Sequence, residues 1–291
     1  MVKFDYFEAF SRNLGILTKQ EQEKIRKAKI AIPGMGGVGG SHLLSLVRQG
    51  FQNFIIADDD EYELKNFNRQ LGADMNTLGE KKTYAIRKKA LEINPNCNIE
   101  IIDGFVTEEN LDFFLKDVDV ALDSIDFFCL DIKRKYFNRA HELGIPIITA
   151  GPIGFGTAYL IFDPKTSPNF DEYFDIHDND TELDKIGKFY IGLCPDSLHK
   201  NYVNFAKEEV VTQKKPGSSM AGVNFASGAV ISNTLKYILG RGNIKAVPYY
   251  HQFDAFENNY ICKKNRFGNK NPLQKIKLHI VKKYMSIPEK K

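Results

Sequence analysis

A run of glycines is the first part of this chain whose residue types and spacing suggest chemistry. Gly34, Gly36, Gly37 and Gly39 directly follow the short apolar segment 29–32. A glycine-rich turn between a buried strand and a helix lets the backbone approach a phosphate, which the first N–H groups of the helix then bind. The spacing also fits the G-x-G-x-x-G pattern of dinucleotide-binding folds. We therefore predict a nucleotide here, with a tight turn that binds nothing as the alternative.

Acidic residues follow the second apolar segment, 54–57. Asp58 ends that segment, 19 residues after Gly39. Dinucleotide-binding folds place an acid at this point to bind ribose hydroxyls. Asp60, in the same turn, is a second candidate, and a solvated turn acid is the alternative for it. A ribose-binding acid suits NAD, FAD and ATP equally, so Asp58 does not choose among them.

Cations and amides come next in the chain. Asn66, Arg69 and Gln70 form an N-x-x-R-Q motif, and Lys82 follows Gly79 near the start of the next helical segment. Arginine binds phosphate oxygens in a bidentate manner and lysine supplies a point charge, so the pair suits a polyphosphate better than a nicotinamide. For each cation alone, a solvated surface position is the alternative.

Carboxylates also follow a later apolar segment, 118–122. Asp123 and Asp126 lie just beyond it, where ligands bind in open α/β sheets. A carboxylate there is suited to hold Mg²⁺ next to phosphate oxygens. A helix cap or a loop acid is the alternative reading.

The elements that must position these residues form a regular pattern. Apolar segments alternate with helical ones across 29–150, which predicts an α/β fold with a doubly wound, mostly parallel, Rossmann-like sheet. One of the expected helices spans 79–93. Beyond it, 163–218 reads as irregular, 220–239 as a helix, and 247–253 with 259–262 as an antiparallel pair. These segments predict a C-terminal antiparallel and irregular elaboration of the fold.

Composition narrows the class of protein. The 291 residues are 43% hydrophobic and 26% charged, as in ordinary globular proteins. The first 28 residues do not resemble a secretory signal, so we expect a cytoplasmic protein. The four cysteines form no C-x-x-C pair, and we expect neither a disulfide framework nor zinc. No nucleic-acid-binding motif is visible, and no nucleic acid is expected as a partner.

The C-terminal tail has a charge of its own. Residues 263–291 contain ten basic residues and one acid. Within 271–285, Leu273, Ile276, Ile280 and Met285 can share one helical face. A basic amphipathic helix is a candidate for contact with an anionic membrane surface or an acidic partner. Docking on its own domain, with lysines reaching into solvent, is the alternative.

Taken together and in order, these motifs resemble those of the ThiF/MoeB-type adenylyltransferases, relatives of the ubiquitin-activating enzymes. The resemblance is close over 1–163 and looser beyond. Phe10-Ser-Arg12-Asn also resembles an N-terminal R-x-x-R-Q segment of that family. The motifs that carry the resemblance are Gly34–Gly39, Asp58–Asp60, Asn66–Gln70, Gly79–Lys82, Ile93–Pro95 and Asp123–Asp126.

The resemblance implies a role for each motif. The glycines would hold the ATP phosphates, Asp58 the ribose, and Asp126 a Mg²⁺ ion. Asn66, Arg69 and Lys82 would contact the triphosphate, with Asp60 and Gln70 in the same binding site. Arg12 would reach into the site of the partner subunit in a homodimer. The implied catalytic residues are Arg12, Arg69, Lys82 and Asp126.

The implied reaction is the attack of a carboxylate on the α-phosphorus of ATP, which needs charge neutralisation more than a protein nucleophile. The acyl substrate would be the C-terminus of a ubiquitin-like carrier protein or a peptide. The corresponding division of the chain is an N-terminal helical arm (1–28), a nucleotide-binding adenylation core (29–163), a substrate-facing elaboration (164–262) and the basic tail (263–291).

The chain also departs from the family. Phe127 follows Asp126 where asparagine is frequent, and the zinc-binding cysteine pairs of many members are missing. Cys194 is a candidate for a thioester step, with an inert buried thiol as the alternative. Two other functions therefore stay open: an NAD(P)- or FAD-dependent oxidoreductase, and a catalytically inactive subunit of an adenylyltransferase.

Overall fold

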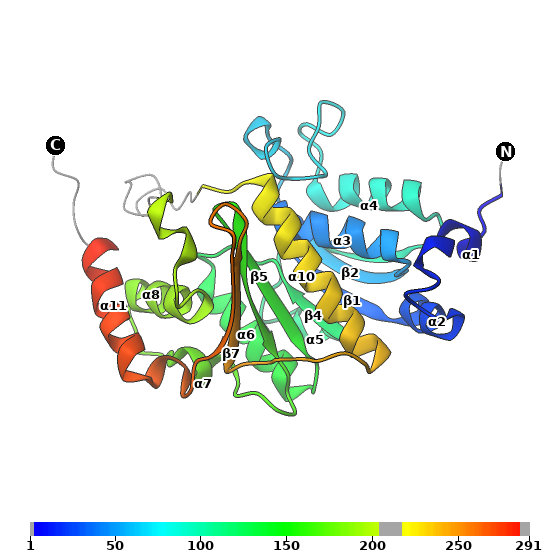
Figure 1. Cartoon of the computed structure of the whole chain (residues 1–291). Helices are drawn as coiled ribbons and strands as arrows, with labels where there is room; N and C mark the ends of the chain where they lie inside the picture. The colour runs from blue at the N-terminus through cyan, green and yellow to red at the C-terminus, as the bar shows by residue number, and fades with distance from the viewer. Residues whose placement is uncertain (1–2, 204–216, 286–291) are drawn as a thin grey trace. The chain divides into compact units, whose positions relative to one another are not determined.

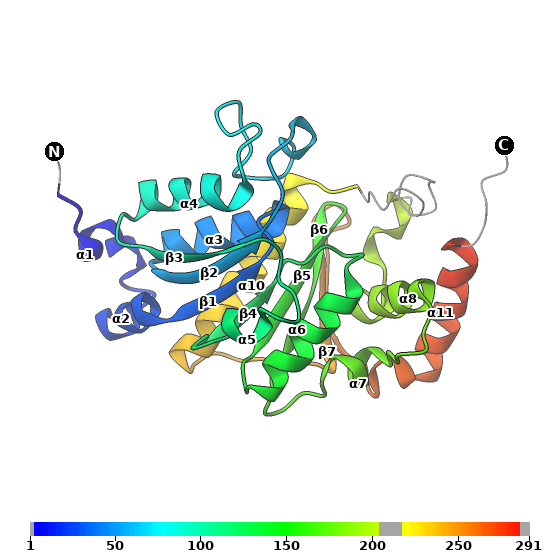
Figure 2. The same ribbon diagram turned by 180° about the vertical axis from the view of Figure 1, so that it is seen from behind.

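Most of the short apolar segments become strands in the computed structural model, which describes residues 3–203 and 217–285. The chain forms two compact units. The first comprises residues up to Ser124 together with Ser227–Ile244, and the second comprises Ile125–Ala226 with the residues from Lys245 onward. Figures 1 and 2 show the elements of both units from opposite sides.

The first unit contains the expected parallel sheet. Its elements are α1 (Tyr6–Ala9), η1 (Ser11–Asn13), α2 (Lys19–Lys27), β1 (Lys29–Pro33), α3 (Gly37–Gln49), β2 (Asn53–Asp58), η2 (Leu64–Asn66), α4 (Lys82–Ile93), β3 (Asn98–Asp103), α5 (Leu111–Phe114), β4 (Val120–Asp123) and the second part of α10 (Met220–Leu239).

The strands of this unit pair in the order β3-β2-β1-β4, all parallel. Helices α3 and α4 connect strands that step outward from β1, and the two helices pack side by side (Figure 1). The chain then returns past β1 to form β4, and right-handed crossovers put the two directions of winding on opposite faces. The point where the winding reverses lies between β1 and β4, and ligands bind at such points in open α/β sheets.

The second unit contains the antiparallel strands. Its elements are α6 (Leu130–Glu142), β5 (Ile147–Ile153), β6 (Gly156–Phe162), α7 (Phe170–Phe174), α8 (Glu182–Leu193), η3 (Leu198–Asn201), the first part of α10, β7 (Tyr249–Asp254), β8 (Asn259–Lys264), η4 (Gly268–Lys270) and α11 (Pro272–Met285). Strands β5 to β8 pair in chain order, each antiparallel to the next. The predicted fold class is confirmed.

The prediction that 163–218 is irregular is wrong for its described part, because α7 and α8 lie there. Both helices begin with a capping box, in which an N-cap side chain and an acid three residues later bond to each other's backbone N–H groups. The pairs are Asn169 with Glu172, and Thr181 with Asp184. These signals are present in the sequence, but the many acids around them resemble a solvated loop. Residues 204–216 lie outside the described residues.

The helix expected over 79–93 begins later, at Lys82. Gly79 has φ +81°, and its N–H donates to the carbonyl of Tyr62. The Tyr62 N–H donates in turn to the carbonyl of Glu80, so these bonds close a loop over residues 62–80. The difference matters because it places Lys82 in the first turn of α4, where its own N–H donates to the Asp60 carbonyl.

Within the described residues, no helix is both long and apolar enough to cross a membrane. The functional division of the chain at residues 28, 163 and 262 remains a prediction. Of the predicted tail, residues 286–291 lie outside the described part of the chain.

Candidate functional site

The glycine turn is packed tightly between the ends of β1 and β4. The Gly34 N–H donates to the carbonyl of Ala57 at 2.6 Å, and Gly34 has φ +96°, which favours glycine. A Cβ at Gly34 would lie 2.6 Å from the Ser124 carbonyl oxygen, and one at Gly39 would lie 1.8 Å from the Gly34 carbonyl oxygen. Neither position has room for a side chain, so these two glycines are required by the fold itself.

Gly36 has a different environment. A Cβ there would meet nothing nearer than the Gln70 amide nitrogen, at 3.9 Å. Gly36 is the N-cap of α3 and has no side chain to bond the first N–H groups of that helix. Gly36, Gly37 and Val38 are all partly exposed. The turn therefore presents unprotected backbone N–H groups and the positive end of a 13-residue helix, which is a favourable site for an anion.

Asp58 fixes the turn from the end of β2. It is buried, its Oδ2 accepts from the Met35 N–H at 2.6 Å, and its Oδ1 accepts from the Asp60 N–H at 2.8 Å. Burial raises the pKa of Asp58, while the charge of Lys82 and the two N–H donors act in the opposite direction. The sequence identified this acid, but its bonds to the glycine turn were not foreseen.

Lys82 brings a buried positive charge close to these acids. Its Nζ lies 2.6 Å from the Asp60 Oδ2, and its side chain is only 7% exposed. The Asp60 side chain is exposed. A lysine ammonium has three N–H donors, so this ion pair leaves donors for a further acceptor.

The loop over residues 62–80 carries the N-x-x-R-Q motif. The buried Asn66 accepts from the Glu63 N–H at 2.8 Å through its Oδ1. Gln70 is also buried, and its Oε1 has no hydrogen-bond partner in the described structure. Arg69 donates to the Lys65 carbonyl at 3.0 Å and to the Asn68 side chain at 2.9 Å. A buried amide without a full set of partners, next to Gly36, is typical of a binding site whose ligand completes the bonds.

Ser124 was not singled out from the sequence, although it ends the same turn as Asp123. Its Oγ donates to the Pro33 carbonyl at 2.6 Å and lies 3.0 Å from the Gly34 carbonyl oxygen. Ser124 thus links the loop after β4 to the glycine turn after β1. In the sequence, only the position of Ser124 at the end of a strand could have indicated this role, and serine is common at such positions.

Arg12 lies elsewhere in the first unit. It is exposed, and within the described residues its guanidinium makes no ion pair. The neighbouring Asn13 anchors the segment, since its amide donates to the Gln22 side chain and to the Gln49 carbonyl, both at 3.0 Å. Asn13, which departs from the family motif, therefore has a structural role here.

Asp126 belongs to the second unit, in the loop before α6. It is exposed, and its Oδ1 accepts from the Phe128 N–H at 2.8 Å. Phe127 packs against Phe128 and against Phe189 of α8, each with ring centroids 5.3 Å apart. No group of three or more potential metal ligands gathers anywhere in the described part of the chain.

Cys194 ends α8 and is fully buried. Its Sγ lies 3.2 Å from the Tyr190 carbonyl oxygen, and burial raises the pKa of the thiol. A thioester with a carrier needs an accessible thiolate, so Cys194 is in the wrong environment for that step.

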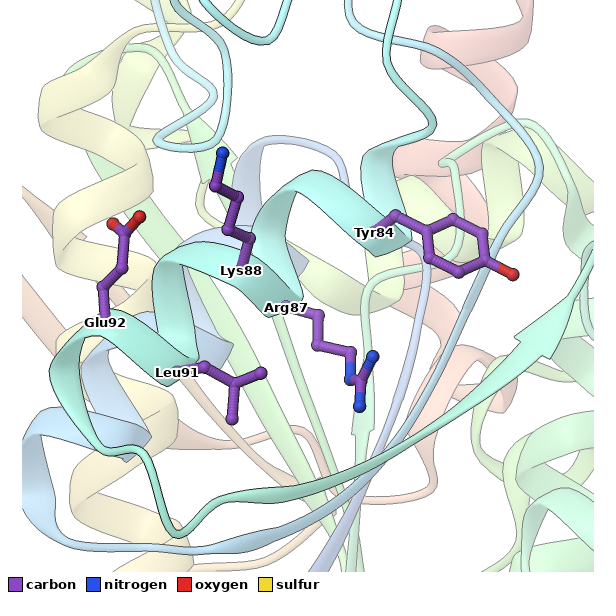
Figure 3. A pocket seen from close by; sticks show the side chains of 5 residues that line it. All are labelled: Tyr84, Arg87, Lys88, Leu91 and Glu92. Atoms are coloured by element: carbon purple, nitrogen blue, oxygen red, sulfur yellow. The ribbon is translucent and has the colours of Figure 1, made fainter.

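A shallow depression on the outer face of α4 contains none of these residues. Figure 3 shows its lining side chains, Tyr84, Arg87, Lys88, Leu91 and Glu92, all from that one helix. We assign it no function.

Comparisons with known proteins identify a matching family and similar folds. Residues 10–275 match the model of the ThiF family. The tRNA threonylcarbamoyladenosine dehydratase of Bacillus subtilis is 31% identical over 48% of this chain and 55% of that protein. The sulfur carrier protein ThiS adenylyltransferase of Escherichia coli is 28% identical over 49% of this chain and 56% of that protein. The chain therefore spans little more than half the length of these relatives.

Among solved structures, E. coli MccB has a TM-score of 0.67 at 18% identity, over 92% of this chain and 74% of that one. At this identity the likeness shows the fold alone. Structures of MccB have been solved with ATP and with MccA.

Proposed function

This chain belongs to the ThiF family, and from that premise we propose that it is an ATP- and Mg²⁺-dependent adenylyltransferase that activates a carboxylate as an acyl-adenylate. The observation that carries the proposal is the N-terminus of α3 at Gly36, which has no side-chain cap. The buried amide of Gln70 lies next to it, 3.9 Å from where a Cβ of residue 36 would be. The buried Lys82 ammonium, which forms an ion pair with Asp60, adds positive charge that a triphosphate needs.

In the proposed reaction, a carboxylate oxygen of the substrate attacks the α-phosphorus of ATP. The bond from that phosphorus to the bridging oxygen of the β-phosphate breaks, and pyrophosphate leaves. Lys82 and Arg69 neutralise the charge that develops on the phosphate oxygens, and the N–H groups at Gly36 and Gly37 bind one phosphate. No protein nucleophile or proton transfer is required, which fits a site rich in cations and backbone N–H groups.

Other roles complete the proposed site. Asp58 binds the ribose while it holds the glycine turn, because each carboxylate oxygen has a second lone pair to offer. Asn66 and Gln70 orient the nucleotide from the loop over 62–80. Arg12, exposed and without an ion pair among the described residues, acts in the partner subunit of a homodimer.

Asp126 fits a magnesium ligand. One of its oxygens is bonded to Phe128, while its other oxygen has no partner within the described residues. Mg²⁺ with a nucleotide is typically held by one or two carboxylates plus phosphates and water, so a single exposed acid is sufficient. When bound, the ion neutralises charge on the phosphate oxygens.

For the acyl substrate, we propose the C-terminal carboxylate of a ubiquitin-like carrier protein or a peptide. The relative named for the sulfur carrier protein ThiS and the MccB complexes with MccA support this class. A second candidate, contrary to the expectation of no nucleic-acid partner, is a carboxylate on a modified tRNA, because a further relative is named as a tRNA threonylcarbamoyladenosine dehydratase. The threonyl group of that nucleoside carries a carboxylate, so adenylation would apply to it equally.

The test is ATP–pyrophosphate exchange by the full chain with Mg²⁺, against carrier proteins, short peptides and threonylcarbamoylated tRNA. We expect exchange with one class only, and ATP binding measured by calorimetry without any substrate. Lys82→Met is expected to lower exchange by roughly 100-fold, as when a charge-stabilising donor is removed from an active site. Lys88→Met is the matched control, since Lys88 is an exposed lysine of the same helix (Figure 3).

Three outcomes would contradict parts of the proposal. NAD binding without ATP binding would favour the oxidoreductase. ATP binding without exchange on any carboxylate would favour an inactive subunit. Full exchange by an Asp126→Ala variant would remove Asp126 as the metal ligand.

A further inference from the structure

Helix α11 docks on the second unit through one side only. The Gln274 amide donates to the Ile191 carbonyl at 3.0 Å, and the Lys277 Nζ donates to the Pro195 carbonyl at 2.6 Å. Lys282 forms an ion pair with Asp184 of α8. Figure 1 shows α11 beside α8. The predicted docking of the tail on its own domain is therefore present in the structure.

The docked side is not the predicted apolar face. Leu273, Ile276 and Ile280 are 67%, 59% and 48% exposed. Residues spaced by three and four positions share one face of a helix, so these three form a continuous aliphatic stripe in solvent. Helix α11 thus has one face that packs on its own unit and one aliphatic face exposed to solvent. Docking accounts only for the first face. The Met285 side chain lies outside the described residues.

The charge around this stripe has a single sign. Residues 263–283 contain eight lysines and arginines and no acid. Lys282 and Lys263 are paired with Asp184 and Asp196 of the same unit. Lys275 and Lys283 are exposed on α11 itself, and Lys283 follows Ile280 by one helical turn. A second copy of this chain would bring the same charges face to face, which disfavours self-association through α11.

We propose that the exposed face of α11 binds an anionic membrane surface, with Leu273, Ile276 and Ile280 entering the headgroup region. An aliphatic stripe bordered by Lys283, with a further exposed cation, Lys275, on the same helix, resembles interfacial helices, in which apolar burial and attraction to anionic lipids add. A convex helix face needs no complementary groove on a membrane, whereas a protein partner would have to supply one. The proposal is independent of adenylation, and its test contains no nucleotide.

The test is flotation of the full chain with vesicles of phosphatidylcholine alone or mixed with phosphatidylglycerol. We expect binding to the mixed vesicles, little binding to phosphatidylcholine, and loss of binding at high salt. An Ile276→Gln, Ile280→Gln variant should bind roughly tenfold more weakly or less. A Lys275→Gln, Lys283→Gln variant should lose about fivefold for each lysine removed.

Two matched controls distinguish binding through α11 from nonspecific binding of the protein surface to vesicles. Ile16→Gln removes an exposed aliphatic side chain of the first unit, and Arg87→Gln with Lys88→Gln removes two exposed cations of α4. Both should float like the natural chain. Circular dichroism and thermal unfolding are the checks that each variant is folded, and each is expected to be folded.

The proposal is overturned if the natural chain does not float, or if the isoleucine variant floats equally well. Binding of polyglutamate without binding of anionic vesicles would also overturn it, in favour of an acidic protein partner.

Discussion

At the level of single residues, three glycines of one turn have different physical reasons to be glycine. A Cβ at Gly34 or Gly39 would overlap a backbone carbonyl oxygen, while a Cβ at Gly36 would be in ordinary contact with the Gln70 amide nitrogen, at 3.9 Å. A substitution at the first two positions is therefore a packing defect, and one at Gly36 would take space from the proposed ligand. The motif that the sequence presents as one signal thus contains glycines in two different environments.

Substitution by alanine separates these environments. Gly39→Ala should destabilise the protein by about 3 kcal/mol or more, because the new Cβ would overlap the Gly34 carbonyl oxygen. Gly36→Ala should leave the thermal midpoint within about 2 °C of the natural value, yet weaken ATP binding at least tenfold by occupying the anion site. Thermal unfolding and calorimetry measure the two effects. If Gly36→Ala bound ATP normally, the turn would not be the phosphate site.

The sequence was sufficient to select candidate residues, whose roles remain predictions, but not to predict their bonds. The order of glycines, acids and cations identified Asp58, Lys82 and Gln70. The bonds from Met35 to Asp58, and from Ser124 to Pro33, depend on which strand ends the fold brings together. Sequence spacing does not contain that information.

At the level of elements, the N-terminus of α2 is held by a residue more than 200 positions away. Arg241, just past the end of α10, bonds to the Glu21 carboxylate and donates to the Ile16 carbonyl at 2.8 Å. Glu21 is also the acid of the α2 capping box with Thr18. These bonds, led by the one from Arg241, lower the pKa of Glu21 to about 2.

An acid whose pKa is lowered by folding contributes stability above its ordinary pKa, and loses it as the pH falls. For Glu21 the window runs from 4.5 down to about 2. We expect Arg241→Gln to lower the urea midpoint of unfolding at about pH 6. The loss should be smaller at more acidic pH, where Glu21 becomes protonated. Equal losses at every pH would mean that the Arg241 bond to the Ile16 carbonyl, not the ion pair, holds the segment.

Helices α7 and α8, which the sequence did not predict, show how charge density can hide a helix. The alternation of apolar segments was sufficient to predict β1, β2, β3 and β4. In contrast, α8 was hidden because acids surround its capping box at Thr181. Charge density indicated a loop where local backbone bonding produced a helix.

At the level of the whole molecule, a deeply buried histidine of altered pKa is found in each unit. In the first unit the Nδ1 of His42 lies 2.9 Å from the Ser227 hydroxyl, and burial lowers the pKa of His42 to about 3. In the second unit the Nε2 of His199 lies 2.9 Å from the Tyr190 hydroxyl, and burial lowers its pKa to about 4. Both imidazoles are therefore neutral in the folded chain at neutral pH.

A base whose pKa is lowered by folding takes up its proton more readily when unfolded. Stability should therefore be complete above pH 6.5 and decline as the pH falls toward about 4 and about 3. His42→Gln and His199→Gln should each reduce the slope of unfolding free energy against pH in this range. Urea unfolding at several pH values measures it. A slope unchanged in both variants would assign the acid sensitivity to other groups.

The division into units was outside the reach of sequence reading. The chain returns to its first unit at Ser227, in the middle of a helix that the sequence predicts as one element. Apolar periodicity marks where a helix begins and ends, but does not tell which body each turn packs against. The parallel strands β1 to β4 and the antiparallel pair of β7 with β8 were predicted from the order of segments, whereas the antiparallel pairing of β6 with β5 and β7 was not.

The two kinds of glycine in the turn have a consequence for how this protein would change over generations. Selection for a folded chain alone is sufficient to keep Gly34 and Gly39. At Gly36 a Cβ would meet only the Gln70 amide nitrogen, at 3.9 Å, so under the proposed function selection for nucleotide binding is the main constraint there. In a lineage that retained the fold after giving up catalysis, Gly36 would be the first of the three to drift.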